Sequence, residues 1–350
     1  MKLTSSILLV TLSAFAFTAC SDDDDKKNDG PDNTGEITFN ATVPRAPRVA
    51  TTTNNIKEFS TWAFTQGTRY MDNVVVSRDG SKWTYSPVMY WPVDDEAVNF
   101  FSVSPAIPAT VSTVTQDRSF DISGYVNTDG ATDMLYAVNM GESSNKTKQV
   151  QVNFRHALSQ VRFALLAQKD TPSIRVDVDA VELLNIYSRG DFQFPRQTTE
   201  RDDISEASRG DWENQSLPTD VRLYSGDAVT LSETENTELN STGYYFALPQ
   251  ELIDSKVNGT TYSGAYARVR CQIFDKTTNV KLWPSSSVSG YNPETQSAWL
   301  YFPLDTDQTR YDEWELGKAY YYVLTVGMPK GSSTISFDVT VDEYDITQEK

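Results

Sequence analysis

Apolar residues that alternate strictly with polar ones constrain this chain more than any other feature of its sequence. The clearest examples lie near its two ends, where the apolar positions are Ile37, Phe39, Ala41 and Val43, and Ile335, Phe337, Val339 and Val341. A period of two places successive side chains on opposite faces of a strand, so both stretches are expected to be half-buried strands. After the N-terminal segment, no run of ten or more residues carries a helical apolar stripe. The sequence therefore predicts an all-β protein.

Composition and turn signals favour a particular kind of β protein. Aromatic residues make up 12% of the chain, and aromatic and β-branched residues are enriched in strands. The short apolar stretches are separated by turn-forming pairs such as Asp79-Gly80 and Asp129-Gly130. Short strands at regular spacing with such turns between them are typical of β-sandwiches.

The length of 350 residues suggests two domains. A charged, turn-rich segment between residues 196 and 220 is the natural place for a junction. We therefore predict an N-terminal sandwich domain over residues 36–196 and a C-terminal one over residues 197–350.

The N-terminus has the features of an exported lipoprotein. Lys2 precedes an apolar run from residue 7 to residue 17, which is followed by Thr18-Ala19-Cys20. A basic start, a short apolar core and a small-residue cleavage site predict a signal peptide over residues 1–19. Cys20 is then the predicted lipidation site, and residues 20–35 a disordered acidic tether. The alternative is a plain secretory signal in which the cysteine is incidental.

Two arginines follow the first alternating stretch. Pro44 ends the predicted strand, and Arg45 and Arg48 come next among small residues. Exposed segments with small and polar residues are preferred sites of proteolysis. Arg45 and Arg48 are therefore the candidate cleavage sites.

Several classes of function are disfavoured. The net charge of −18, without a compensating basic patch, argues against a nucleic-acid partner. The single histidine, His156, leaves no multi-histidine metal site, and we expect it to be structural, at a corner where the apolar pattern slips by one residue. Cys271 is expected to be a small buried hydrophobe. No catalytic residue, metal site or cofactor is predicted, and the chain is not expected to be an enzyme.

Two further motifs have ordinary structural explanations. The tripeptides Arg189-Gly190-Asp191 and Arg209-Gly210-Asp211 match a cell-attachment sequence, but turns and strand ends account for their glycines. Tyr320-Tyr321-Tyr322 and the seven tryptophans could stack on sugars, although aromatic residues in strands are more often core residues.

A set of motifs, in their order along the chain, resembles the fimbrillin-like (Mfa-like and FimA-like) proteins of Bacteroidales. Each motif is loose by itself, and together they span nearly the whole chain. They are the Cys20 lipobox with its acidic tether, Tyr90-Trp91-Pro92 with residues 100–105, Asp133-Met134-Leu135-Tyr136-Ala137, residues 154–159, Phe246-Ala247-Leu248-Pro249-Gln250, residues 314–322 and the last alternating stretch.

The resemblance implies a fold and a route of assembly. The fold would be two transthyretin-like Greek-key β-sandwich domains. The chain would be a type V pilus component, exported to the outer membrane as a lipoprotein, trimmed by a protease and polymerised by donor-strand exchange with other fimbrial subunits to mediate cell adhesion. The strand lost would be residues 37–43, and the donor strand residues 335–341. The alternatives are a fimbrial anchor or tip protein that escapes cleavage, and a surface glycan-binding lipoprotein.

Overall fold

Strands dominate the computed structural model, in agreement with the all-β prediction. The structure describes residues 35–43, 53, 55–93, 95–107, 112–116, 119–127, 130–169, 173–200, 205–239, 243–258, 261–305, 312–329 and 337–343. All of them belong to one compact unit, Gly35–Lys350. Within these ranges the helical structure is the short 3-10 helix η1 (Glu206–Ser208), and no helix is long and apolar enough to cross a bilayer.

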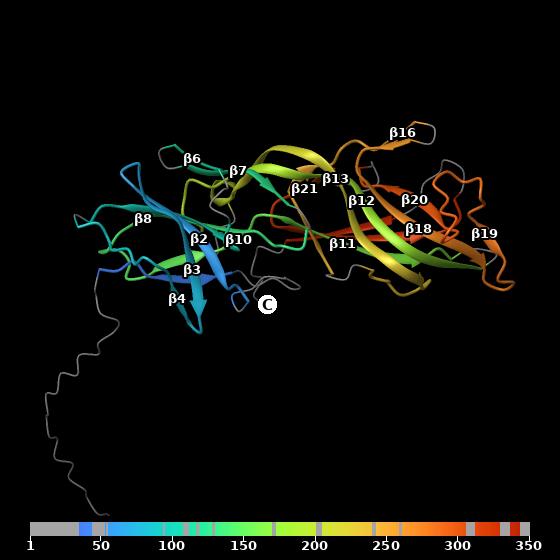
Figure 1. The fold of residues 1–350 in the computed structure, drawn as a ribbon, viewed down its shortest axis with the longest axis horizontal. Coiled ribbons are helices and arrows are strands. Elements are labelled where there is room, and N and C mark those ends of the chain that lie inside the picture. Colours follow the sequence, from blue (N-terminus) through green and yellow to red (C-terminus); the bar gives the residue numbers. More distant parts are fainter. Residues whose placement is uncertain are drawn as a thin grey trace, which may run out of the picture. The chain divides into compact units, whose positions relative to one another are not determined.

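A six-stranded sheet forms the first part of the fold (Figure 1). Its strands lie in the order β10 (Arg155–His156), β8 (Leu135–Glu142), β5 (Val98–Ser104), β2 (Glu58–Thr65), β3 (Thr68–Asp79) and β4 (Lys82–Thr84). Its central strands are apolar on both faces. On β2, Phe59 and Ala63 join one hydrophobic cluster, whereas Trp62 and Phe64 join another. This sheet is therefore covered on both sides.

The first of these two clusters is completed by a separate pair of strands. They are β1 (Phe39–Thr42) and β9 (Val150–Asn153), which pair in parallel. The second cluster includes Phe120, Phe192 and Trp212, which come from the other main sheet of the fold.

That other sheet has seven strands with two long ones at its centre. Its order is β19 (Lys281–Trp283), β18 (Tyr266–Asp275), β12 (Ile174–Gln193), β7 (Ser119–Val126) and β6 (Ser112–Gln116), with β13 (Asp211–Thr230) on β12 and β20 (Ala298–Pro303) on β18. The long ribbons of β12 and β13 run side by side and curve together (Figure 1). Several register shifts along this pair mark β-bulges, which increase strand bending.

A four-stranded sheet packs against the seven-stranded one to form a sandwich. Its order is β14 (Tyr245–Ala247), β11 (Ser159–Ala167), β22 (Lys318–Val326) and β23 (Phe337–Glu343). Alternate residues of β11 and β22, such as Phe163 and Tyr322, share one cluster with Val269 and Cys271 of β18. Two small antiparallel pairs complete the fold, β15 (Gln250–Glu251) with β21 (Glu313–Trp314) and β16 (Lys256–Asn258) with β17 (Thr261–Ser263).

The sandwich mixes strands from both sides of residue 196. β11 and β12 precede that position, yet they pair with β22 and with β18 and β13, which follow it. The division into domains at residues 36–196 and 197–350 stays a prediction.

The slip in the apolar pattern around His156 corresponds to a crossing between sheets, and His156 lies at that corner, as predicted. The chain leaves β9, adds the two residues of β10 to the six-stranded sheet, and enters the four-stranded sheet at β11. Three consecutive strands thus belong to three different sheets.

Candidate functional site

The most distinctive local structure lies where the first strand covers a hydrophobic core. We refer to residues 37–43, of which Phe39–Thr42 form β1, as the first-strand segment. Its four apolar side chains are almost fully buried, with exposed fractions of 1% for Ile37 and Phe39, 3% for Ala41 and 5% for Val43. The alternation in the sequence is therefore reproduced in space.

Phe39 occupies the centre of this core. Its ring makes edge-to-face contacts with the rings of Phe59, Tyr85 and Phe100, at centroid distances of 5.8, 5.6 and 5.7 Å. Such pairs contribute about 0.5–1.5 kcal/mol beyond the burial of their area. The Phe39 ring therefore fills a socket, which we define as the space enclosed by the rings of Phe59, Tyr85 and Phe100.

The backbone of the segment is held mainly along one edge. Phe39 lies opposite Val150 and Ala41 opposite Val152 in the parallel pairing with β9. The Val150 amide donates to the Thr38 carbonyl at 2.8 Å, and the Phe154 amide to the Thr42 carbonyl at 2.8 Å. In the described part of the chain, β1 is the strand with which β9 pairs.

One main-chain and one side-chain hydrogen bond hold the start of the segment. The Ile37 amide donates to the Met89 carbonyl at 2.9 Å, and the Tyr85 hydroxyl donates to the Ile37 carbonyl at 2.7 Å. Burial raises the pKa of Tyr85 above its ordinary value, so its hydroxyl remains a donor at neutral pH.

The outward face of the segment is polar and matches the polar residues of β9. The Asn40 amide donates to Gln151 Oε1 at 2.8 Å, and the Thr42 hydroxyl donates to Asn153 Oδ1 at 2.8 Å. The Thr38 hydroxyl reaches the Lys148 carbonyl at 3.1 Å. These contacts fix which residue of β1 faces which residue of β9.

The end of the segment is joined to the chain that follows the arginines. The Val43 amide donates to Thr53 Oγ1 at 2.8 Å, and the Thr53 hydroxyl donates back to the Val43 carbonyl at 3.1 Å. The candidate cleavage sites Arg45 and Arg48 lie between Val43 and Thr53 in the sequence. Both arginines are outside the described residues, and so is Cys20.

The predicted donor strand forms the edge of the four-stranded sheet. β23 pairs in antiparallel fashion with β22, with Phe337 opposite Leu324, Val339 opposite Tyr322 and Val341 opposite Tyr320. Ile335 lies outside the described residues. The roles of residues 37–43 and 335–341 in exchange stay predictions.

His156 has a structural role, as expected, through a buried partner that the sequence did not identify. Its Nδ1 lies 2.9 Å from Asp133 Oδ2, and both side chains are buried. The partner of the imidazole is therefore a buried carboxylate. Asp133 precedes β8 and His156 ends β10, so the pair joins two of the motifs on which the resemblance rests.

Both attachment-like tripeptides are built into the fold. Gly190 lies within β12, and a Cβ placed on Gly210 would approach the Phe192 ring to 2.3 Å. The Asp191 carboxylate accepts hydrogen bonds from the Gly124 amide at 2.6 Å, from Ser123 Oγ at 3.1 Å and from Asn214 Nδ2 at 2.8 Å. Packing and hydrogen bonding account for these residues, although Gly190 lies within β12 and not at the strand end that the sequence analysis assumed.

The hydrogen bonds to Asp191 predict an acid-sensitive contribution to stability. The Asn214 side chain, followed by the Gly124 amide and Ser123, holds the pKa of Asp191 below its ordinary value. A group with a depressed folded-state pKa stabilises the fold above its unfolded pKa of about 3.9 and loses that contribution as the pH falls through the folded value. We therefore expect Asp191→Asn to destabilise the protein at pH 7, and the difference from wild type to shrink towards pH 3, as measured by urea unfolding.

Asp227→Asn, at an exposed position of β13, is the matched control and should give a small difference at both pH values. An Asp191→Asn effect that is constant from pH 7 to pH 3 would show that the carboxylate charge is not what these donors stabilise.

The remaining candidates are core residues. Cys271 is fully buried, and burial raises the pKa of its thiol far above the ordinary value, as expected of an inert cysteine. Tyr320, Tyr322, Trp283 and Trp314 are buried in the sandwich, and Trp62, Trp91 and Trp212 are buried in the other two hydrophobic clusters. This arrangement favours the core interpretation of the aromatic residues over a sugar platform.

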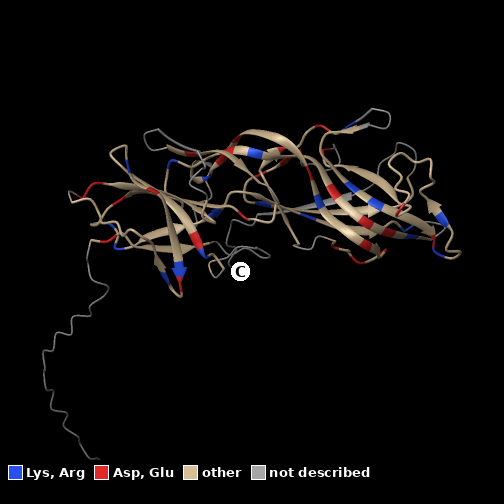
Figure 2. Ribbon diagram, viewed as in Figure 1, with Lys and Arg blue, Asp and Glu red and all other residues tan. Residues whose placement is uncertain are grey.

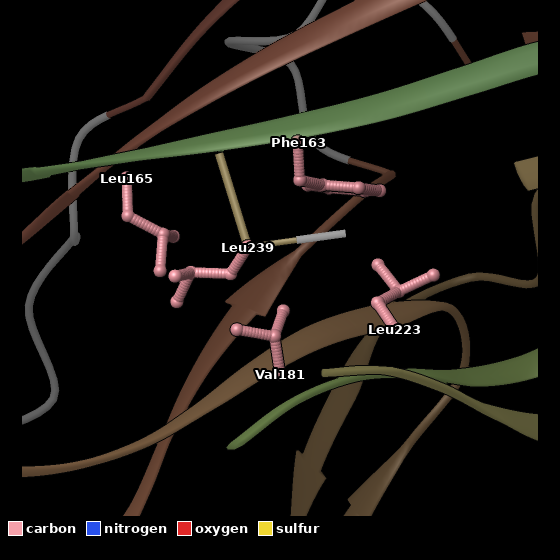
Figure 3. A pocket seen from close by; sticks show the side chains of 5 residues that line it. All are labelled: Phe163, Leu165, Val181, Leu223 and Leu239. Carbon is pink, nitrogen blue, oxygen red and sulfur yellow. The ribbon is translucent and has the colours of Figure 1, made fainter. Parts of the chain in front are cut away.

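A narrow pocket between the two sheets of the sandwich is lined only by apolar side chains. They come from β11, β12, β13 and the segment after β13, and they point towards one another in Figure 3: Phe163, Leu165, Val181, Leu223 and Leu239. Binding sites usually add a few convergent polar groups to such a lining. Among the described residues no cluster of histidine, cysteine and acidic side chains is arranged to hold a metal ion.

Acidic and basic residues lie interspersed on the ribbons of β12, β13 and β18 (Figure 2). Two ion pairs across β12 and β18 illustrate this mixing, Arg268 with Glu182 at 2.5 Å and Arg270 with Asp179 at 2.6 Å. The charges on this sheet therefore neutralise one another locally.

The chain is similar to solved fimbrial proteins from bacteria. A solved fimbrial protein from Bacteroides vulgatus is 18% identical, with a TM-score of 0.56 over 88% of this chain and 99% of that chain. The fimbrial anchor protein Mfa2 from Porphyromonas gingivalis is 8% identical, with a TM-score of 0.33 over 89% of this chain and 98% of that chain. No curated protein matches the chain. A model of the family described as fimbrillin-like matches residues 45–343, so this chain belongs to the fimbrillin-like family.

Proposed function

We propose that this protein is the precursor of a structural subunit of an adhesive surface fimbrium, and that its first-strand segment is a removable plug. The observation that carries the proposal is that four side chains of this segment are buried in the core, while the segment pairs with one described strand, β9. These side chains are Ile37, Phe39, Ala41 and Val43. The fimbrillin-like family is not a family of enzymes, and the solved relative from Bacteroides vulgatus is a fimbrial protein.

Removal of the segment would leave the protein with an exposed core. Burial of a large apolar side chain contributes about 1.5–3 kcal/mol, so Ile37, Phe39 and Val43 together contribute roughly 5–9 kcal/mol. That sum is comparable to the whole stability of a domain, about 5–15 kcal/mol. β9 would lose its strand partner at the same time, and a strand from another subunit would restore both the core and the pairing.

The position of the arginines suits such a release. A cut after Arg45 or Arg48 would separate the first-strand segment from Thr53, to which Val43 is hydrogen-bonded. The segment would then be held by non-covalent contacts alone and could dissociate. The predicted lipid on Cys20 would first deliver the chain to the cell surface, where cleavage would free it from its anchor.

The test is to remove both arginines. We expect Arg45→Ala with Arg48→Ala to reach the surface, keep its N-terminus at Cys20 and remain monomeric, while the wild type is cut and assembled into polymers. N-terminal sequencing and native gels of protein from intact cells provide the readouts. Arg196→Ala, an exposed arginine outside this segment, is the control and should assemble normally.

Assembly of the double variant at wild-type levels would show that cleavage at these arginines is not required. A wild-type protein that keeps lipidated Cys20 at its N-terminus would identify an uncut anchor or a role outside fimbriae.

A further inference from the structure

The long ribbon of β12 and β13 runs through two hydrophobic clusters. Ile186 of β12 and Leu223 of β13 belong to the cluster inside the sandwich, which also contains Val269. Phe192 of β12 and Trp212 of β13 belong to the second cluster of the six-stranded sheet. The ribbon therefore connects two cores, and its middle lies at the boundary between them.

Both strands of the ribbon have an irregular backbone at that boundary. Asn185 has a φ of +59° and Leu217 a φ of +60°, so both lie in the left-handed region. The pairing register of the two strands shifts between Leu183 and Ile186. A leucine with a left-handed backbone is uncommon and strained, and such strain persists only where the surrounding structure holds it. We refer to residues 185–187 and 217–219 as the elbow.

The elbow lacks a strand neighbour on one edge. β13 pairs with β12 along one edge from Asp177 to Gln193, so β18 and β7 share the other edge. The pairing with β18 ends at Leu184, and the pairing with β7 begins at Arg189. Within the described residues, no strand pairs with β12 on this edge between those two positions.

The Gln250 side chain takes the place of the missing strand. Its Oε1 accepts a hydrogen bond from the Tyr187 amide at 2.8 Å, and its Nε2 donates to the Tyr187 carbonyl at 3.1 Å. The same nitrogen donates to the Leu248 carbonyl at 2.9 Å, and Gln250 is 4% exposed. One buried amide group thus supplies both of the hydrogen bonds that a paired strand residue would exchange with Tyr187.

This arrangement also accounts for a proline in the middle of β13. Pro218 lies opposite Tyr187 in the pairing of β12 with β13. A proline cannot donate to a strand ladder and is usually excluded from strand interiors. Because the main-chain groups of Tyr187 point to Gln250, the ladder loses no hydrogen bond at Pro218.

The residue before Gln250 holds the other strand of the ribbon. Gln215 Nε2 of β13 donates to the Pro249 carbonyl at 2.6 Å. Within the elbow, the Ser188 hydroxyl of β12 donates to the Leu217 carbonyl at 3.0 Å. Both strands are therefore tied to residues 249–250 and to each other.

We propose that Pro249-Gln250 is a clamp that holds the elbow rigid, and that without the clamp the elbow is a hinge between the two cores. These residues end the motif Phe246-Ala247-Leu248-Pro249-Gln250, for which the function proposed above gives no role. Leu248 lies in the second cluster and Leu252 in the sandwich cluster, so the clamp itself lies at the boundary. A fully bonded buried amide rigidifies its surroundings. The clamp therefore fixes how the two cores of one subunit are oriented.

Replacing Gln250 with methionine in the purified, uncut chain tests the clamp. Methionine has a similar length, but its thioether cannot replace the amide donor and is a weak acceptor. We expect the Tyr187 amide to exchange its hydrogen at least about ten-fold faster than in the wild type, because its acceptor is lost. Hydrogen exchange of a peptide covering residues 185–190 is the readout. Gln272→Met, which removes a hydrogen bond to the Gln296 carbonyl on the outer face of β18, is the matched control and should leave that peptide unchanged.

Small-angle X-ray scattering of the same proteins tests the hinge. We expect one orientation of the two cores to fit the wild type and Gln272→Met, and several orientations to be needed for Gln250→Met. Gln215→Met is a milder variant, because it removes only the hydrogen bonds of one half-buried side chain, and it should change the scattering in the same direction by less. Its result decides the question if Gln250→Met does not fold.

The two measurements can each overturn the proposal. Unchanged exchange in Gln250→Met would show that Gln250 is not a clamp. Faster exchange with scattering that one orientation still fits would show that the elbow is not a hinge. Neither measurement involves cleavage or assembly, so the outcome is independent of the proposed function.

Discussion

Replacing Phe39 with alanine is expected to lower the free energy of unfolding by about 3–5 kcal/mol. The side chain is 1% exposed, and its ring contacts the rings of Phe59, Tyr85 and Phe100. The substitution removes buried apolar area and leaves a cavity. The walls of this cavity are aromatic rings from β2, β5 and the segment after β4. Because main-chain pairing holds these elements in place, the cavity cannot close fully. Urea unfolding of the purified, uncut chain measures the change.

Asn40→Ala on the outward face of the same strand is the matched control. It removes one exposed hydrogen bond to Gln151 and should cost about 0.5–1.5 kcal/mol. A loss below about 1 kcal/mol for Phe39→Ala would mean that the socket is not a stabilising part of the precursor. The proposed function would then lose its energetic basis.

Replacing Asp133 with alanine is expected to destabilise the protein by about 2–4 kcal/mol. The carboxylate of Asp133 lies 2.9 Å from His156 Nδ1, and both side chains are buried where β8 and β10 pair. Without its acceptor, the Nδ1–H group would be left in an apolar interior. Asp133→Asn keeps an amide oxygen at that position and should lose less than half as much.

Unfolding measurements compare the two variants, and His156 provides a second readout. It is the only histidine in the chain, so its ring protons give a single set of imidazole NMR signals. These signals should shift strongly in Asp133→Ala and weakly in Asp133→Asn. Equal losses for both variants would show that packing around residue 133, and not the hydrogen bond, is what matters.

Strands with one buried face were predictable from sequence, because burial imposes the period of two. The pattern at residues 37–43 and the apolar odd positions around Cys271 both correspond to buried faces in the structure. β13 was not predicted over its full length, and part of it was assigned to a linker. Most of its side chains are exposed, so it carries no such period, and it is held by main-chain pairing with β12.

The first-strand segment of the site was predictable from sequence, but the strand with which it pairs was not. Alternation identified the first-strand segment, yet its partner β9 lies more than a hundred residues away, as the separation of Asn40 and Gln151 shows. Parallel pairing across such a distance leaves no local mark in either strand. For the same reason the contact between Asp133 and His156 was not predictable, although both residues lie in motifs on which the family resemblance rests.

The passage of the chain through β9, β10 and β11 has a mechanical consequence. In a fibre of the proposed kind, the incoming strand would pull on β9, and the outgoing last strand would pull through β22, which pairs with β11 over eight residues. β9 and β11 are separated by five residues of continuous backbone. Tension would therefore pass from one subunit to the next through covalent bonds and strands loaded in shear, bypassing the side-chain packing between sheets.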